Sequence, residues 1–143
     1  MINREKGKVN CIVRVYSNGK KIFEANKMIM NAGLELLASR LYNNTDNYLG
    51  YVAIGTDNTA EDPNQTALGN EIFRKAVTST THSGGVTTIT VNILYTEAND
   101  NWKEIGLFND STGGVMFDRV VVDYTKTDSD YVTIEFEITF AGV

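Results

Sequence analysis

A strictly alternating stretch near the end of the chain most constrains its fold. In residues 131–140, large apolar side chains occupy every second position and polar side chains fill the positions between them: Val132, Ile134, Phe136, Ile138 and Phe140 against Thr133, Glu135, Glu137 and Thr139. Successive side chains of a strand point to opposite faces, so this pattern predicts a half-buried antiparallel strand with five apolar groups inward. The same period recurs in Ile89, Val91, Ile93 and Tyr95. Because half-buried strands must cover one another, we expect a mostly β fold, an antiparallel β-sandwich.

The first hairpin and the helix have local signals of their own. Asn18-Gly19 lies between the apolar runs 8–16 and 21–25, and such a pair is typical of a type I′ turn. Asn31 is placed to cap a helix over residues 32–42, whose predicted apolar face consists of Leu34, Leu37, Ala38 and Leu41. No other convincing helix is predicted beyond a single turn at 67–71.

The remaining apolar runs predict the other strands, at 51–55, 72–81, 86–96, 102–108 and 115–123, which gives about eight strands in total. A polar loop over 56–66 interrupts them. The 143 residues predict a single domain over residues 1–143, with residues 1–7 as an N-terminal arm. The apolar runs are too short to cross a bilayer, and the N-terminus lacks the pattern of a secretory signal.

Charge and cysteine content exclude several functional classes. The formal net charge of −5 disfavours nucleic acid as a partner, because affinity for phosphates comes largely from lysine and arginine. Cys11 is the single cysteine and shares a predicted strand face with Val9, Val13 and Val15, so we interpret it as a small buried hydrophobic residue. One cysteine and one histidine cannot form the usual structural zinc site. We expect neither a cofactor nor a membrane partner.

Few residues offer chemistry. His82 is the only histidine and lies beside Ser83-Gly84-Gly85, where we expect a solvated turn residue rather than a catalytic one. Acidic residues in two loops could supply oxygen ligands to calcium, although the calcium-loop spacing is absent: Asp57, Glu61 and Asp62, then Glu97 and Asp100. Trp102 with Tyr42, Tyr48 and Tyr51 could form a sugar-stacking surface, but aromatic residues of a sandwich more often lie in its core. We therefore predict a protein that is not an enzyme.

Short motifs follow one another in a fixed order along the chain: Asn31-Ala32-Gly33, Val52-Ala53-Ile54-Gly55-Thr56, Thr66-Ala67-Leu68, Glu71 with Arg74, Glu104-Ile105-Gly106-Leu107-Phe108, Gly113-Gly114, Met116-Phe117-Asp118-Arg119 and Lys126. This ordered set resembles a family of tailed-bacteriophage virion proteins, in which an AIGTG segment is followed by EIGLF, a glycine turn and a last β-hairpin. The resemblance covers roughly residues 30 to 140. Asp57 stands where the family pattern has a second glycine.

The resemblance implies a structural role in the virion, assembled in the host cytoplasm. Related patterns occur at the attachment end of tail fibres and in small free-standing virion proteins, and the chain ends soon after its last predicted strand, without a shaft. We therefore expect a capsid decoration protein that contacts the major capsid protein, as a homo-oligomer such as a trimer. The alternatives are a tail-fibre or baseplate attachment component that contacts tail proteins, and a surface carbohydrate-binding adhesion module.

Two groups of charged residues complete the expectations. Glu104 enters a strand beside core residues, and a buried carboxylate needs a charged partner, for which Arg74 and Arg119 are the candidates. We interpret these three residues as determinants of the fold. Arg4, Lys6 and Lys8 make the N-terminus basic, and they could form an interface arm that reaches a neighbouring protein.

Overall fold

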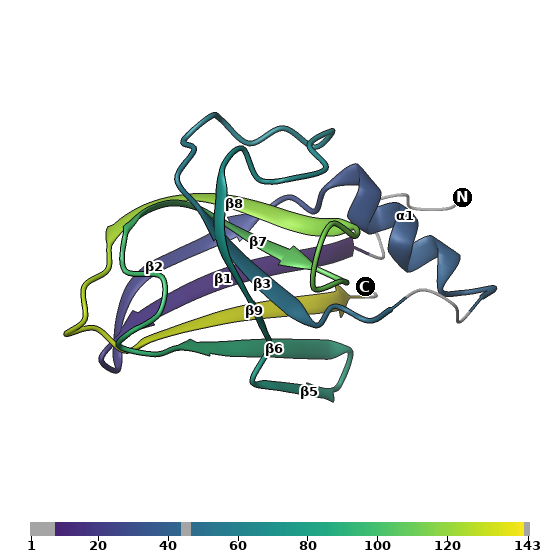
Figure 1. Cartoon of the computed structure of the whole chain (residues 1–143). Coiled ribbons are helices and arrows are strands. Elements are labelled where there is room, and N and C mark those ends of the chain that lie inside the picture. The colour runs from purple at the N-terminus through teal and green to yellow at the C-terminus, as the bar shows by residue number, and fades with distance from the viewer. Residues whose placement is uncertain (1–7, 44–46, 142–143) are drawn as a thin grey trace.

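The computed structural model describes residues 8–43 and 47–141 of the chain (Figure 1). These residues form nine strands and one helix: β1 (Lys8–Ser17), β2 (Lys20–Lys27), α1 (Asn31–Ser39), β3 (Tyr51–Gly55), β4 (Glu71–Ala76), β5 (Ser79–Ser83), β6 (Val86–Ile93), β7 (Asn101–Phe108), β8 (Met116–Thr125) and β9 (Val132–Ala141). The prediction of a mostly β sandwich with one short helix is confirmed, with nine strands in place of about eight.

Two antiparallel sheets face each other. The first has the order β2-β1-β9-β6-β5 and the second the order β4-β3-β7-β8. Strand β9 lies in the middle of the first sheet, between β1 and β6, and α1 lies beside one end of the sandwich (Figure 1). The β1–β2 turn has the positive φ angles expected of type I′, 50° at Asn18 and 84° at Gly19. No helix in the described part of the chain has the length and hydrophobicity needed to cross a lipid bilayer.

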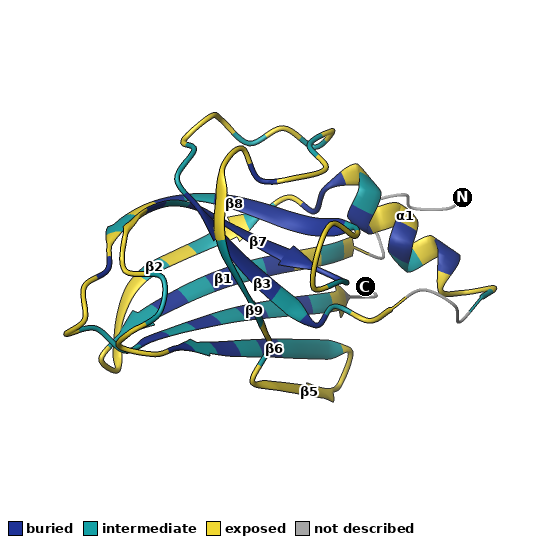
Figure 2. Cartoon of the chain, in the orientation of Figure 1, coloured by how far each residue is buried: buried dark blue, intermediate teal, exposed yellow. Residues whose placement is uncertain are grey.

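The inward faces of both sheets form one apolar core (Figure 2). Four of the five predicted inward side chains of β9 are buried, and Cys11 on β1 is buried with them, as expected: Val132, Ile134, Phe136 and Ile138. Phe140 differs, since it remains 48% exposed where it borders an open apolar pocket together with Leu37 and Leu49. Tyr95 is also exposed, because β6 already ends at Ile93.

The predicted strand over residues 72–81 is two strands in different sheets. The chain leaves the second sheet after Ala76 and enters the first at Ser79. The backbone N–H of Val77 donates to the carbonyl of Gly50 (2.9 Å), and the next N–H, of Thr78, donates to the carbonyl of Thr90 (2.7 Å). Consecutive amides therefore bind opposite sheets, and this crossing leaves no trace in the local hydrophobic pattern.

Helix α1 buries a face that overlaps the predicted one only at Leu37, which is half-buried against the core. Leu36 is buried, whereas the other predicted residues are exposed: Leu34 (44%), Ala38 and Leu41 (89%). Close approach to β8 selects this face: a Cβ atom on the buried Gly33 would lie 2.6 Å from the carbonyl oxygen of Phe117. The glycine thus allows the helix to lie directly against the strand.

The start of α1 also differs from the prediction. Met30 is the N-cap residue, and the helix ends at Ser39 rather than at residue 42. Asn31 does not cap the helix with its side chain. Its Nδ2 instead donates to Oδ1 of Asn64 (2.8 Å), and its backbone N–H donates to the carbonyl of Pro63 (2.8 Å). The first turn of the helix is therefore attached to the loop over residues 56–70.

Candidate functional site

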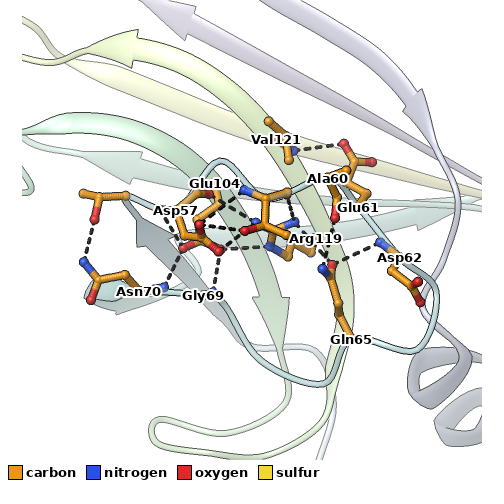
Figure 3. A network of polar contacts seen from close by, with 12 residues as sticks. Asp57, Ala60, Glu61, Asp62, Gln65, Gly69, Asn70, Glu104, Arg119 and Val121 are labelled. Carbon is orange, nitrogen blue, oxygen red and sulfur yellow. Dashed lines mark hydrogen bonds and ion pairs between the residues drawn. The ribbon is translucent and has the colours of Figure 1, made fainter.

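The most highly organised polar site is an ion pair, Glu104 on β7 with Arg119 on β8, on the side of the second sheet that faces away from the core (Figure 3). The side chains of Glu104 and Arg119 are 0% and 1% exposed, and Nε of Arg119 donates to Oε1 of Glu104 at 2.8 Å. Residues 56–70 cover the pair, and we call this segment the clamp loop. Sequence analysis left Arg74 and Arg119 as candidate partners of Glu104, and the structure selects Arg119.

Glu104 fixes the two ends of the clamp loop. Its carboxylate accepts three backbone N–H groups, from Asp57 (3.1 Å), Gly69 (2.8 Å) and Asn70 (2.8 Å), in addition to the guanidinium of Arg119. The predicted helical turn at 67–71 is absent, because the N–H groups of Gly69 and Asn70 bind this carboxylate instead. Four donors are enough to stabilise a buried carboxylate.

Arg119 fixes the middle of the clamp loop. Its guanidinium donates to the carbonyls of Asp57 (3.1 Å) and Thr59 (2.9 Å) and to Oε1 of Gln65 (3.2 Å). Two hydrogen bonds to Asp62 position Gln65. Its side-chain Oε1 accepts the backbone N–H of Asp62, and its backbone N–H donates to the backbone carbonyl of Asp62. The clamp loop therefore folds around a cation that the chain itself supplies.

Glycine is required where the clamp loop meets the carboxylate. A Cβ atom on Gly55 would collide with the carboxylate of Glu104, and one on Gly69 would collide with the side chain of Asp57. The side chain of Asp57 therefore packs against Gly69. This contact leaves room for an aspartate at the position where the bacteriophage family pattern has a second glycine. The carboxylate of Asp57 also lies 3.8 Å from the guanidinium of Arg119.

Glu61 attaches the clamp loop to the free edge of β8. Its Oε1 accepts the backbone N–H of Val121 (3.0 Å) and lies 3.0 Å from Nζ of Lys27 on β2. The contact satisfies one backbone donor of an edge strand, which would otherwise be open to pairing with another chain.

Arg74 has a separate role on β4, the opposite edge strand of the second sheet from β8. It forms an ion pair with Glu71 (2.6 Å), its guanidinium lies 3.8 Å from the ring centre of Phe108, and it donates to the carbonyls of Asp110 (2.8 Å) and Gly113 (2.9 Å). Arg74 therefore holds the β7–β8 connection, whereas Arg119 holds the clamp loop. Both arginines hold connections of the second sheet in place, and their importance for folding stays a prediction.

A positively charged side chain from elsewhere in the chain binds each of the two acidic loops considered for calcium. Arg119 of β8 binds the first loop. At the second loop, Nζ of the buried Lys126 donates to Oδ1 of Asn99 (2.7 Å) and to the carbonyls of Tyr95 and Thr127 (3.3 and 3.4 Å). Glu97 is paired with Lys75 at 3.0 Å. The described residues contain no cluster of acidic, histidine or cysteine side chains suited to a metal ion.

Other sequence candidates are dispersed. His82 is exposed, as expected, but it lies on the edge strand β5, where it pairs with Thr87, and not in the turn that the sequence predicted. Trp102 is fully buried, with its Nε1 donating to the carbonyl of Ala98, and therefore cannot join a surface with Tyr42, Tyr48 and Tyr51. Of the basic N-terminal residues, Lys8 begins β1 and is exposed, whereas Arg4 and Lys6 lie outside the described residues.

Asp118 is a buried group that sequence analysis missed. It lies on β8 within the core, opposite Cys11, and neither carboxylate oxygen has a hydrogen-bond partner among the described residues. Burial, reinforced by the negative charge of Glu61, raises the pKa of Asp118 to about 7. Burial also raises the pKa of the Cys11 thiol, with a further contribution from Asp118. The available signal was the period of two shared by Asp118, Val120 and Val122, which places a carboxylate on an apolar face.

No family model matches this chain, and no curated protein or solved structure matches it either.

Proposed function

We propose that this protein is a non-enzymatic structural protein of a tailed-bacteriophage particle and that it decorates the outer face of the capsid shell. The observation that carries the proposal is that three of the ordered motifs meet at one clamp. Asp57, Glu104 and Arg119 come from three separate segments and meet around a single buried ion pair (Figure 3). Gly55, at the end of the first of these motifs, leaves room for the carboxylate of Glu104. These three segments of the resemblance therefore share one structural role in this chain, which is to hold the clamp loop.

The clamp is suited to holding a loop and unsuited to acid–base chemistry. A general acid or base must reach the proton that it transfers. Glu104 is fully buried and its carboxylate receives four N–H donors, while Arg119 is occupied by five contacts with Glu104, Asp57, Thr59 and Gln65. These contacts support a role in positioning the clamp loop.

A rigid loop on a small sandwich is a suitable docking element. The clamp loop exposes mainly uncharged side chains, among them Asn58, Ala60, Asn64 and Thr66. Interface cores are depleted in charged residues, and a loop already held in place loses little conformational entropy on binding. We propose that this loop contacts the major capsid protein, with the decoration protein bound as a homo-oligomer at a local symmetry axis.

The experiment adds purified protein to particles that lack it and counts the bound copies. We expect hundreds of copies on the shell, seen by cryo-electron microscopy, because a decoration protein follows the symmetry of the capsid. Ala60→Arg places a charge on the exposed clamp loop and should reduce occupancy at least tenfold. The matched control Thr81→Arg places the same charge on the exposed edge strand β5 and should bind as the wild type does.

Each outcome decides between the assignments. A few to a few dozen copies, located on tails, would replace decoration by a tail-fibre or baseplate role. Binding to neither shells nor tails would overturn the virion assignment. Equal shell occupancy by Ala60→Arg and Thr81→Arg would remove the clamp loop as the contact surface.

A further inference from the structure

A second surface site lies at the start of β3, beside the connection between β7 and β8. Of the residues that the structure describes, five line a pocket of about 220 Å³: Asn47, Tyr48, Tyr51, Asn109 and Asp110. Register brings the two segments together, because Tyr51 pairs with Phe108, the residue before Asn109. Pockets for drug-sized molecules are about 300–1,000 Å³, so this one suits a smaller ligand such as a single ring.

We propose that this pocket binds a neutral sugar ring, as the terminal hexose of a glycan. The exposed ring of Tyr48 supplies a surface on which a sugar ring can stack. The side chain of Tyr48 packs over Gly50, where a Cβ atom would lie 3.0 Å from the ring, and yet Tyr48 is 76% exposed. A ring that is held by backbone on one side and open on the other offers an apolar face to the C–H groups of a pyranose.

The polar groups of the pocket match hydroxyl groups. Asn109 uses its Oδ1 to accept the N–H of Val115 (2.7 Å), and Asp110 uses its Oδ1 to accept the N–H of Ser111 (2.7 Å). Among the described residues, the Nδ2 of Asn109, the Oδ2 of Asp110 and the amide of Asn47 have no partner. The free carboxylate oxygen accepts and the free amides donate, and neighbouring sugar hydroxyls can do both.

The pocket is already organised without a ligand. Arg74 donates to the carbonyls of Asp110 and Gly113 and so fixes the wall of the β7–β8 connection. Tyr51 is half-buried against a second apolar cluster that contains Met30 and Phe108. Preorganised polar groups lose less entropy on binding, which favours recognition of a small ligand.

Charge selects a neutral ligand. Asp110 places a carboxylate in the pocket, and the whole chain carries a formal net charge of −5. Both features repel phosphates, nucleotides and acidic sugars. With negatively charged ligands excluded, a hexose fits the pocket. Its C–H face can stack on Tyr48, and its neighbouring hydroxyl groups can bind the amide and carboxylate groups of Asn47, Asn109 and Asp110.

Saturation-transfer NMR on the isolated full chain tests the proposal with glucose, galactose, mannose and N-acetylglucosamine as separate probes at millimolar concentration. We expect transfer to at least one of them, with a Kd of about 1 mM. Tyr48→Ala should weaken binding roughly tenfold through loss of stacking. Asp110→Asn should also weaken it, while its remaining Oδ1 still accepts the Ser111 N–H.

Tyr42→Ala is the matched control, because Tyr42 is 79% exposed and is not among the lining residues. It should leave the sugar signal unchanged. Absence of transfer to all four sugars, or equal transfer with Tyr48→Ala and Tyr42→Ala, would overturn the proposal. The experiment uses no particles, so its failure would leave the decoration proposal standing, and loss of shell binding would leave this one standing.

Discussion

Two buried carboxylates in this protein have opposite surroundings. Glu104 receives four N–H donors, one of them from a buried guanidinium, whereas the oxygens of Asp118 have no hydrogen-bond partner among the described residues. The nearby Cys11 thiol and the backbone N–H of Arg119 do not reach hydrogen-bond geometry with Asp118, and although they favour its ionised form, burial outweighs them. Glu104 therefore stabilises the fold through these contacts, whereas burial favours the neutral form of Asp118.

Glu104→Gln should destabilise the protein by about 3–5 kcal/mol, the usual cost of breaking a buried ion pair from one side. The substituted amide donates where the chain already supplies donors, and it leaves Arg119 buried without a counter-charge. The measurement is urea unfolding followed by tryptophan fluorescence, which reports the buried Trp102.

Glu135→Gln serves as the matched control for this prediction. Glu135 is also paired with an arginine, Arg14, but its side chain is 27% exposed and Arg14 keeps Glu24 and Glu137 as partners. The control should cost less than about 1 kcal/mol. Similar losses from both substitutions would contradict the special role of the Glu104–Arg119 pair.

Asp118 makes stability depend on pH in a calculable direction. Its pKa is about 7 in the folded protein and about 3.9 in an unfolded chain, so the folded state holds an extra proton between these values. The free energy of unfolding contributed by this group is therefore highest below about pH 4 and falls as the pH rises to about 7. The full difference corresponds to roughly 4 kcal/mol.

Asp118→Asn should remove this pH-dependent loss. The unfolding free energy of the variant relative to the wild type should increase by roughly 4 kcal/mol from about pH 4 to about pH 8. Denaturant unfolding of both proteins across this range measures the difference, and the subtraction cancels the titration of other shared groups. A difference that stays constant with pH would show that Asp118 is not held neutral in the fold.

At the scale of elements, α1 shows why a hydrophobic pattern can select the wrong face. Leu34, Leu37 and Leu41, together with Ala38, have helical spacing, and the prediction followed this spacing. The buried face instead follows Gly33, since the absence of a side chain brings the helix against Phe117. Such a contact depends on the shape of a partner that is distant in the chain, and a periodicity argument cannot include it.

The corrected helix face predicts unequal effects for two chemically identical substitutions. Leu36→Ala removes a buried side chain and should cost about 2–5 kcal/mol, whereas Leu34→Ala removes one that is 44% exposed and should cost less than about 1 kcal/mol. Thermal unfolding of the two variants provides the comparison. A larger loss for Leu34→Ala would restore the face predicted from the leucine pattern.

In the whole molecule, the features that could be predicted from the sequence are those that neighbouring residues determine. Alternation identified the strands of the hairpins, and Asn18-Gly19 identified the first turn, because side-chain direction and backbone φ are properties of neighbouring residues. The crossing at Val77 and Thr78 and the choice of Arg119 as the partner of Glu104 depend on which strands become neighbours. Sequence analysis identified Glu104 and its two candidate arginine partners, but it could not decide which arginine binds the carboxylate.

The arrangement of the first sheet gives β9 a central position, with β1 on one side and β6 on the other. Phe136 pairs with Val13 and Ile89 across these neighbours and is fully buried between the two sheets. A carboxylate at this position would be desolvated without a partner, and the cost of several kcal/mol is comparable to the whole stability of an average domain. Strand β9 therefore joins the beginning and the middle of the chain into one cooperative unit.

Phe136→Asp should consequently abolish soluble, cooperatively folded protein. The matched control is Thr139→Asp, which places the same carboxylate on the half-exposed outer face of the same strand and should keep a cooperative transition within about 1 kcal/mol of the wild type. Circular dichroism and a urea titration on both variants give the comparison. A folded, cooperative Phe136→Asp protein would mean that β9 packs with its other face inward, and the order of the first sheet would then have to be redrawn around it.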